Sequence, residues 1–151
     1  CEDFQNRAFV TQTWDLTLDD WPDRDFIRVP LPPLQSVTSI AYKDTDGTSA
    51  TWATTNYISD TAKRPAEIHL AYSKSWPSTT LYPTSAITIR FVAGYGAASA
   101  VPKTVKQAML LLIGHWHTNR EATVDAMKRG DSLPIPFGVD ALLMMDRIWP
   151  M

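Results

Sequence analysis

Apolar and polar residues alternate in short stretches through the first two thirds of the chain, a pattern typical of β-strands. The clearest stretch runs from Ile87 to Ala93, where Ile87, Ile89 and Phe91 fall on one face and polar residues interrupt them. Shorter strands of this kind, bounded by Pro, Gly and Asp, are predicted over residues 26–29, 36–43, 48–53 and 68–72. The second and third of these flank Asp44-Thr45-Asp46-Gly47, whose glycine suits a tight turn, so they should pair as a hairpin.

A different period begins after Pro102, a residue suited to the first position of a helix. Apolar residues then recur every third or fourth position, at Val105, Ala108, Met109, Leu112, Ile113 and Trp116. This spacing predicts an amphipathic helix that continues to about residue 122 and buries its apolar stripe, Trp116 included, against the sheet. Gly130 and the prolines at 134 and 136 break it, and a short apolar helix is expected from Val139 to Ile148. The fold class is therefore predicted to be α+β.

The composition excludes several classes of protein. A chain of 151 residues with 44% hydrophobic residues can form a folded domain. Its net charge of −2 lacks the basic excess of a nucleic-acid-binding protein. No apolar run approaches the length of a membrane span, and a single cysteine excludes an internal disulfide. Because the chain begins with Cys1 rather than Met, we expect a processed or incomplete product.

The charges are unevenly distributed along the chain. Residues 1–25 hold seven acids and two bases, for −5, whereas residues 103–129 hold five bases and two acids, for +3. Such segments are either solvated faces or complementary patches between identical subunits. The candidate patch residues are Asp19, Asp20, Asp23, Lys103, Lys106 and Arg120.

Histidines offer the strongest hint of chemistry, in His115-Trp116-His117. On a helix the two rings lie about 200° apart, whereas zinc-binding helices place two histidines four residues apart on one face. A metal-dependent hydrolase using His115, His117 and Glu121, with only His69 to add, stays an unfavoured alternative. We predict no catalytic residue, no metal site and no cofactor.

Six tryptophans suggest a second alternative, a β-rich module that binds carbohydrate or another protein through exposed rings. Trp52 lies in a predicted strand and Trp116 on the helical stripe, so both are expected in the core. Trp149 ends the apolar stretch that starts at Leu142. This terminal helix must bury its apolar residues either against the chain's own sheet or against a second protein.

The order of these segments carries a family resemblance, although no single segment is diagnostic. In chain order they are Arg7-Ala8-Phe9, Thr11-Gln12-Thr13-Trp14, Trp21-Pro22, Leu31-Pro32-Pro33-Leu34, Ser36-Val37-Thr38-Ser39-Ile40, Asp44-Thr45-Asp46-Gly47, Trp76-Pro77, Phe91-Val92-Ala93-Gly94-Tyr95-Gly96, Val101-Pro102, Gly114-His115-Trp116, Arg120-Glu121 and Leu142-Leu143. Over most of its length the chain thus resembles the head-tail connector, or adaptor, proteins of tailed double-stranded DNA bacteriophages and gene transfer agents.

The resemblance implies a β domain inserted ahead of one long amphipathic helix, with a short C-terminal helix or arm. Residues 1–10 would end an N-terminal helical segment whose earlier part is absent before Cys1. Residues 11–100 would form the β-rich domain, 101–125 the long core helix, and 126–151 a Pro-interrupted spacer and docking helix.

The resemblance also implies a structural role, without enzymatic activity, in the virion neck between capsid and tail, after assembly in the host bacterial cytoplasm. Copies would form a twelve-fold ring below the portal protein and meet a stopper or tail-terminator protein. DNA would pass through the lumen without specific binding, and the protein would make no membrane contact. In the alternative function, the protein that exposed tryptophans bind would be another tail component. The C-terminal arm would dock on the portal through Leu142, Leu143, Met144, Met145, Arg147, Ile148 and Trp149.

Overall fold

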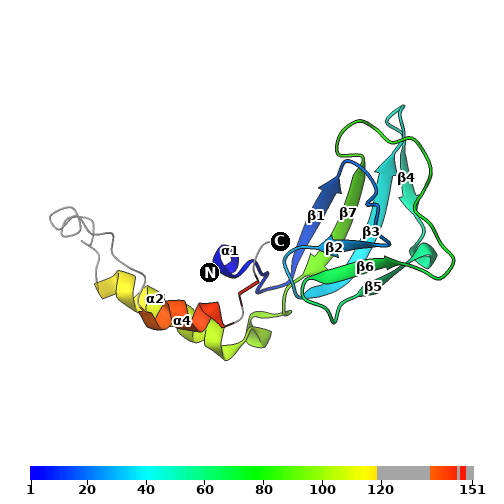
Figure 1. The fold of residues 1–151 in the computed structure, drawn as a ribbon. Helices are drawn as coiled ribbons and strands as arrows, with labels where there is room; N and C mark the ends of the chain where they lie inside the picture. Colours follow the sequence, from blue (N-terminus) through cyan, green and yellow to red (C-terminus); the bar gives the residue numbers. More distant parts are fainter. Residues whose placement is uncertain (119–136, 146, 149–151) are drawn as a thin grey trace.

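The computed structural model describes residues 1–118, 137–145 and 147–148, and it confirms an α+β fold (Figure 1). Four antiparallel strands form one sheet in the order β1 (Gln12–Leu18), β7 (Ile87–Ala93), β3 (Leu34–Lys43) and β4 (Ser49–Trp52). A second antiparallel sheet has the order β2 (Phe26–Val29), β6 (Ala66–Leu70) and β5 (Tyr57–Asp60). The described helices are α1 (Glu2–Gln5), α2 (Lys103–Thr118) and α4 (Phe137–Met144), with 3₁₀ turns at Thr54–Asn56 and Ala98–Ala100.

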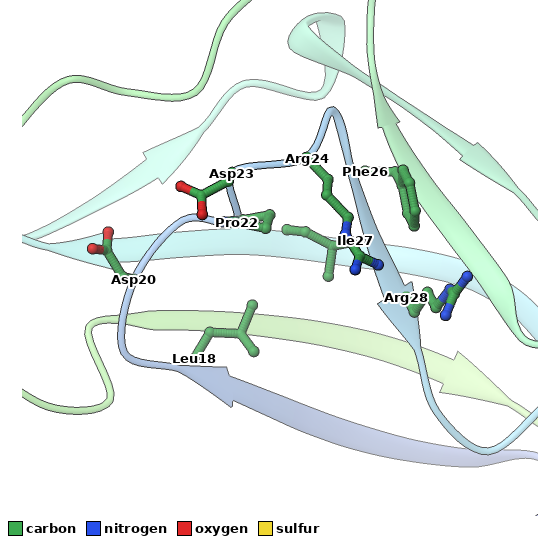
Figure 2. A pocket seen from close by; sticks show the side chains of 8 residues that line it. All are labelled: Leu18, Asp20, Pro22, Asp23, Arg24, Phe26, Ile27 and Arg28. Atoms are coloured by element: carbon green, nitrogen blue, oxygen red, sulfur yellow. The ribbon is translucent and has the colours of Figure 1, made fainter. Parts of the chain in front are cut away.

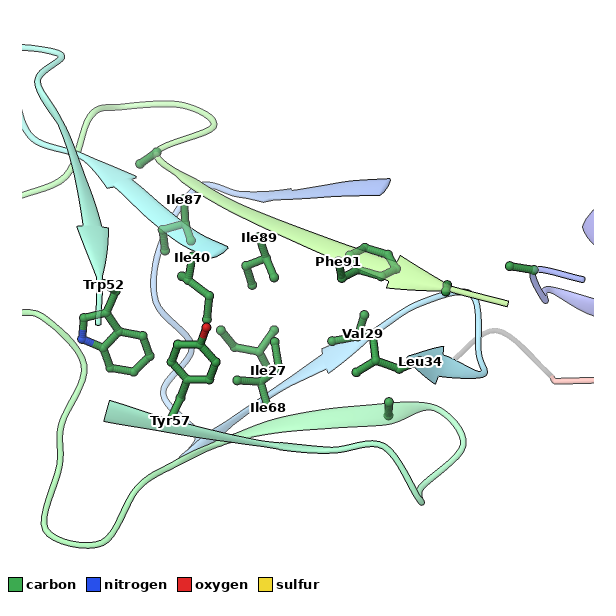
Figure 3. Packing of buried hydrophobic residues seen from close by; sticks show 14 residues of the cluster. Ile27, Val29, Leu34, Ile40, Trp52, Tyr57, Ile68, Ile87, Ile89 and Phe91 are labelled. Carbon is green, nitrogen blue, oxygen red and sulfur yellow. The ribbon is translucent and has the colours of Figure 1, made fainter. Parts of the chain in front are cut away.

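The two sheets pack face to face and bury the main hydrophobic core between them (Figure 3). β7 lies inside the larger sheet, and its alternation places Ile87, Ile89 and Phe91 in the core, as predicted. Ile27 and Ile68 meet them from the smaller sheet. Each sheet thus covers the apolar face of the other, as in a β-sandwich.

The predicted hairpin is confirmed, because β3 pairs with β4 in antiparallel register. The Asp44 carboxylate accepts hydrogen bonds from the backbone N–H groups of Asp46 and Thr48, at 3.1 and 2.8 Å. Gly47 follows with φ +80°, a conformation that glycine adopts without steric cost. The four-residue segment is therefore a turn.

Two strands, β1 and β5, are additional to those predicted, and one predicted strand ends two residues earlier than expected. Tyr72 is almost fully exposed and lies outside β6, which ends at Leu70. The chain turns there, since the N–H of Lys74 donates to the Ala71 carbonyl and Ser73 has a positive φ. The alternation of Leu70 and Tyr72 therefore continues beyond the strand.

Aromatic rings close one end of the sandwich. Trp52 is buried, as predicted, and stacks on Tyr57 with ring centroids 5.5 Å apart. Trp21 and Trp76 stack on each other at 5.1 Å and both contact Trp52. These rings complete the core where the strands end.

Gly94 marks the point where the chain leaves the sandwich for the helices. Its φ is +113°, and a Cβ added there would overlap the carbonyl oxygen of Val10. The Gly94 N–H donates to the Pro33 carbonyl at 2.8 Å. Only glycine therefore lets the N-terminal segment lie this close to the end of β7.

The prediction that α2 covers a sheet is wrong. α2 and α4 lie side by side, away from both sheets, and form a helical arm with α1 (Figure 1). Trp116, predicted in the core, is 62% exposed, and Ile113 is 58% exposed. The physical reason is that the two sheets already cover each other, so neither has an apolar face left for α2.

The base of α2 nevertheless joins the arm to the sandwich. Val105 packs with Phe9 and Val101 in a small cluster that Tyr95 borders. Further along, Ala108 packs against Val139 of α4 in a separate cluster. The predicted continuation of α2 to residue 122 and the predicted spacer lie outside the described residues, and α4 ends at Met144 rather than at Ile148.

Candidate assembly surfaces

The predicted acidic patch lies on the loop that follows β1. Asp19, Asp20 and Asp23 are all exposed. The Asp19 carboxylate accepts the Ser85 N–H at 2.7 Å, and Asp20 accepts the Trp21 N–H at 2.7 Å. These bonds fix the loop while the carboxylates stay in contact with solvent.

The described part of the predicted basic patch lies in the first turns of α2. Lys103 is exposed, and the Lys106 ammonium donates to the Ser99 carbonyl at 2.9 Å. Arg120 lies outside the described residues. β1 starts beside Gly96 near the arm and extends away from it for about 20 Å at 3.3 Å per residue, so the acidic loop lies at the opposite end of that strand. One chain does not bring the two patches together.

A shallow pocket of about 340 Å³ lies beside the acidic loop, between the edge strands β1 and β2 (Figure 2). Its walls combine Asp20 and Asp23 with two arginines, Arg24 and Arg28. Both guanidinium groups lie within 6 Å of the Phe26 ring centroid, at 5.9 and 5.5 Å. Because both signs of charge line the pocket, its electrostatics select neither an anion nor a cation.

An ion cluster surrounds Glu67 on the smaller sheet. The carboxylate accepts from the Lys63 ammonium at 2.6 Å and from the Arg28 guanidinium at 3.4 Å, and it lies 3.0 Å from the His69 ring nitrogen. The hydrogen bond from Lys63 is the main reason why the pKa of Glu67 is lowered, and it raises the pKa of Lys63 in turn. A carboxylate held ionised by three neighbours stabilises the sheet rather than acting as a general base.

A second ion pair lies on the outer face of the larger sheet. Asp15 of β1 and Arg90 of β7 face each other in the register and form two hydrogen bonds, at 2.8 and 2.7 Å. The bond from Arg90 lowers the pKa of Asp15. Like the Glu67 cluster, this pair joins neighbouring strands and leaves no charge directed at a ligand.

The three histidines lie on two different elements. His69 belongs to β6, whereas His115 and His117 belong to α2, and Glu121 lies outside the described residues. Within the described residues, no three His, Cys, Asp or Glu side chains are grouped as a metal ion would need. None of the described helices is long and apolar enough to cross a membrane.

The tryptophans do not form a shared binding platform in the described part of the chain. Trp21, Trp52 and Trp76 direct their rings at one another at the end of the sandwich. Trp14 and Trp116 are exposed, but the first lies on β1 and the second on α2. The carbohydrate-binding alternative therefore gains no support from neighbouring exposed rings.

The predicted C-terminal docking residues divide into groups with different surroundings. Leu143 is buried against α2, and Leu142 is half-buried beside it. Met144 and Met145 are exposed, whereas Arg147 and Ile148 are half-buried beyond the helix. Trp149 lies outside the described residues. Within the chain, the helix thus packs on another helix rather than on the sheet, and Met144 and Met145 remain exposed.

Polar contacts tie the end of the arm to the N-terminal segment. The Gln5 side chain donates to the Leu143 carbonyl at 2.8 Å, and Asn6 donates to the Ile148 carbonyl at 2.7 Å. The Ile148 N–H returns a bond to the Gln5 carbonyl, and the Arg147 guanidinium lies 4.7 Å from the centroid of the Phe4 ring. These contacts fix residues 147–148 beside α1.

Part of the helical stripe that the sequence pattern assigned to the core lies on an exposed apolar surface. Leu110, Ile113 and Trp116 of α2 are all more than half exposed. Ile113 and Trp116 also line a groove of about 700 Å³. Its other walls are mostly apolar, and they include the charged residues Glu2, Asp3 and Lys106 besides Phe9, Val10, Ala98, Val101, Met109 and Leu112. The sequence does carry a signal for this surface, because Leu110 and Leu111 lie outside the predicted stripe. They make the apolar part of the helix surface too wide to be covered by a single neighbouring element.

Comparison with known proteins gives structural matches only. No protein-family model matches the chain, and no curated protein is significantly similar to it. Its fold matches a chain in the neck of a native gene transfer agent particle computed with twelve-fold (C12) symmetry. That match has a TM-score of 0.76 and 24% identity, and it covers 99% of this chain and 76% of the other.

Two further matches come from the same kind of particle. A chain in the virion of a native gene transfer agent has a TM-score of 0.75 and 24% identity. One in the neck of an empty particle, computed with six-fold (C6) symmetry, has 0.72 and 25%. Each match covers 99% of this chain and 72% of the other. This chain therefore has the fold of proteins found in the necks and virions of gene transfer agents.

Proposed function

We propose that this chain is a structural subunit of the neck of a phage-like virion. Identical copies form a ring below the portal protein, extend the DNA channel and bridge to the next neck or tail protein, a stopper or tail terminator. The observation that carries the proposal is the shared fold over 99% of the chain with a protein of a symmetric neck, at a TM-score of 0.76.

The electrostatics of the chain support a passive conduit. Each phosphate that a protein neutralises releases counterions and adds affinity for DNA, so a channel wall should lack a basic surface. The net charge is −2. The positive charges of Lys63 and Arg90 are paired with Glu67 and Asp15 within the sheets. DNA then passes through the lumen without specific binding, and the protein acts by shape and contact rather than by catalysis.

The position of the charged patches supports a ring. A cyclic assembly of identical subunits uses two different patches on each copy. The acidic loop after β1 and the basic first turns of α2 lie apart in one chain, so Asp19, Asp20 and Asp23 are free to face Lys103 or Lys106 of a neighbouring copy. We include this pairing in the proposal, with Arg120 as a further basic member.

Portal docking belongs to the end of the C-terminal arm. Leu142 and Leu143 pack against α2 or beside it, so we assign them to the support of the arm. We propose that the portal contact is made by residues 147–151, with Arg147, Ile148 and Trp149 as its centre, and that Met144 and Met145 serve a contact between copies.

Imaging with the portal tests this function. The purified chain mixed with portal rings should give, in negative-stain images, a second ring stacked coaxially on the portal. Trp149→Ala should weaken the stacking, because tryptophan side chains are frequent centres of interface energy. Trp14→Ala is the matched control, since it removes an exposed tryptophan from β1.

Two outcomes would contradict the proposal. Portal rings that never carry a second ring would reject the neck position. Equal binding by both variants and by a chain that lacks residues 147–151 would reject the docking segment alone.

A further inference from the structure

Two apolar faces of the helical arm have no partner within the described chain. The first, the α2 face, consists of Leu110, Ile113 and Trp116, which are 63%, 58% and 62% exposed. The second, the α4 face, consists of Met144, the last residue of α4, and Met145, which follows it; they are 42% and 75% exposed. Exposed apolar side chains that gather in this way mark interaction sites in soluble proteins.

These faces lie on different sides of the two-helix layer. α2 contacts α4 through Ala108, and at 3.6 residues per turn Leu110, Ile113 and Trp116 lie about 200°, 140° and 80° around the helix from that residue. α4 contacts α2 through Val139, and Met144 lies about 140° around from it. The α2 face is therefore centred on Ile113, about 140° around α2 from the contact with α4, and Trp116 forms its edge nearest to α4. Met144 points away from α2.

The two faces suit each other chemically. Ile113 and Trp116 of the α2 face line the groove of about 700 Å³, whose other walls are mostly apolar and also include Glu2, Asp3 and Lys106. Methionine side chains are unbranched and adapt to irregular apolar hollows, and their sulfur atoms make favourable contacts with aromatic rings such as that of Trp116. Tryptophan is also enriched among the interface residues that contribute most of the binding energy.

We propose that the α4 face of one copy packs against the α2 face of the next copy around the ring. The proposal rests on the ring proposed above and assigns its apolar contact. The two faces differ and lie on different sides of the arm, so each copy can offer one face to each of its two neighbours. This is a head-to-tail arrangement, which can close into a cyclic assembly.

The dimensions of such a ring fit a channel. Packed helices lie about 8–10 Å apart, so two helices per copy give a circumference of roughly 190–240 Å for twelve copies. Twelve is the symmetry computed for the neck of a matching particle. The corresponding mean diameter is about 60–75 Å, which leaves a lumen wide enough for a DNA duplex.

Substitutions of matched exposure test the contact. Ile113→Asp places a charge on the α2 face, and Met145→Asp places one on the α4 face. Ile58→Asp is the control, because Ile58 lies on β5 and is 60% exposed, close to the 58% of Ile113. In native mass spectrometry of the full chain at high concentration, with and without portal rings, we expect Ile58→Asp to form the wild-type oligomer and the other two variants to stay monomeric. Unchanged circular dichroism and melting midpoints would show that all three fold.

Mixing the two defective variants gives a sharper readout. Ile113→Asp keeps its α4 face and Met145→Asp keeps its α2 face, so one intact contact forms between them and the open ends cannot extend. An equimolar mixture should therefore yield one-to-one heterodimers and no rings. A contact made by one face with itself would not give this result.

The contact and the ring fail in distinguishable ways. Rings that persist in both Ile113→Asp and Met145→Asp would overturn this contact and leave the neck role standing. A wild-type chain that forms no oligomer, alone or on portal rings, would overturn the ring and with it the proposed function.

Discussion

The β-sandwich and the helical arm solve the burial of apolar residues in different ways. In the sandwich, Ile89 and Phe91 of one sheet meet Ile27 and Ile68 of the other, and all four are buried. In the arm, the sixteen-residue α2 has only Val105 and Ala108 buried. A layer of two helices covers one side of each and leaves the other side bare, so the arm is suited to completing its core in an assembly.

Phe91→Ala should have the largest effect, because it removes a ring from the closed core. Truncation of a buried Phe costs about 3–5 kcal/mol of unfolding free energy. Urea denaturation monitored by tryptophan fluorescence would measure this loss. A cost below about 1 kcal/mol would mean that the core at Phe91 is not closely packed.

Leu143→Ala should have a smaller and more local effect. Leu143 packs between α4 and α2, near the edge of the arm. The substitution should therefore lower the unfolding free energy by about 2–3 kcal/mol, the lower part of the range for truncation of a buried Leu. Hydrogen exchange should quicken at the amides of α4 and stay unchanged in β7. Equal acceleration in both elements would show that arm and sandwich unfold as one unit.

Glu67→Gln should change how stability depends on pH. The pKa of Glu67 is lowered in the folded chain, mainly by Lys63, so the ionised carboxylate stabilises the fold above the pKa that it has in the unfolded chain. That stabilisation is lost as pH falls through the lowered folded value. The melting midpoint of the variant should therefore lie below that of the wild type at pH 7 and approach it in acid; a constant difference at all pH values would contradict the ion cluster.

Trp116→Ala should have the smallest effect on the isolated chain. The ring is mostly exposed, so its removal should change the unfolding free energy of the monomer by no more than about 0.5 kcal/mol. Chemical denaturation at low protein concentration provides the measurement. A loss as large as that of Leu143→Ala would show that Trp116 belongs to the core of the monomer after all.

Much of the fold could be predicted from the chain alone. The alternation over Ile87–Ala93 predicted the central strand and its inward face, and Asp44-Thr45-Asp46-Gly47 predicted the hairpin turn. The strand β1 carried the same signal, with Leu16 and Leu18 alternating with Thr and Asp, and was missed. Local periodicity can reveal such strands because a strand buried on one face alternates apolar and polar residues along its sequence.

The candidate assembly surface could not be predicted in the same way. Periodicity indicates that residues such as Ile113 and Trp116 share a helix face, but not which surface covers that face. The pattern was therefore interpreted as packing on the sheet. The division of the C-terminal segment into a buried Leu143 and an exposed Met145 likewise depends on where α2 lies.

The sequence by itself determined the α+β class, the main strands, the hairpin turn and the two apolar helices, because each depends on contacts or dihedral angles within a few residues. Only the tertiary structure decided that the sheets cover each other and that α2 pairs with α4. The reason is that burial is a competition among all apolar faces of the chain, and once the two sheets had paired, the outer faces of both helices remained uncovered.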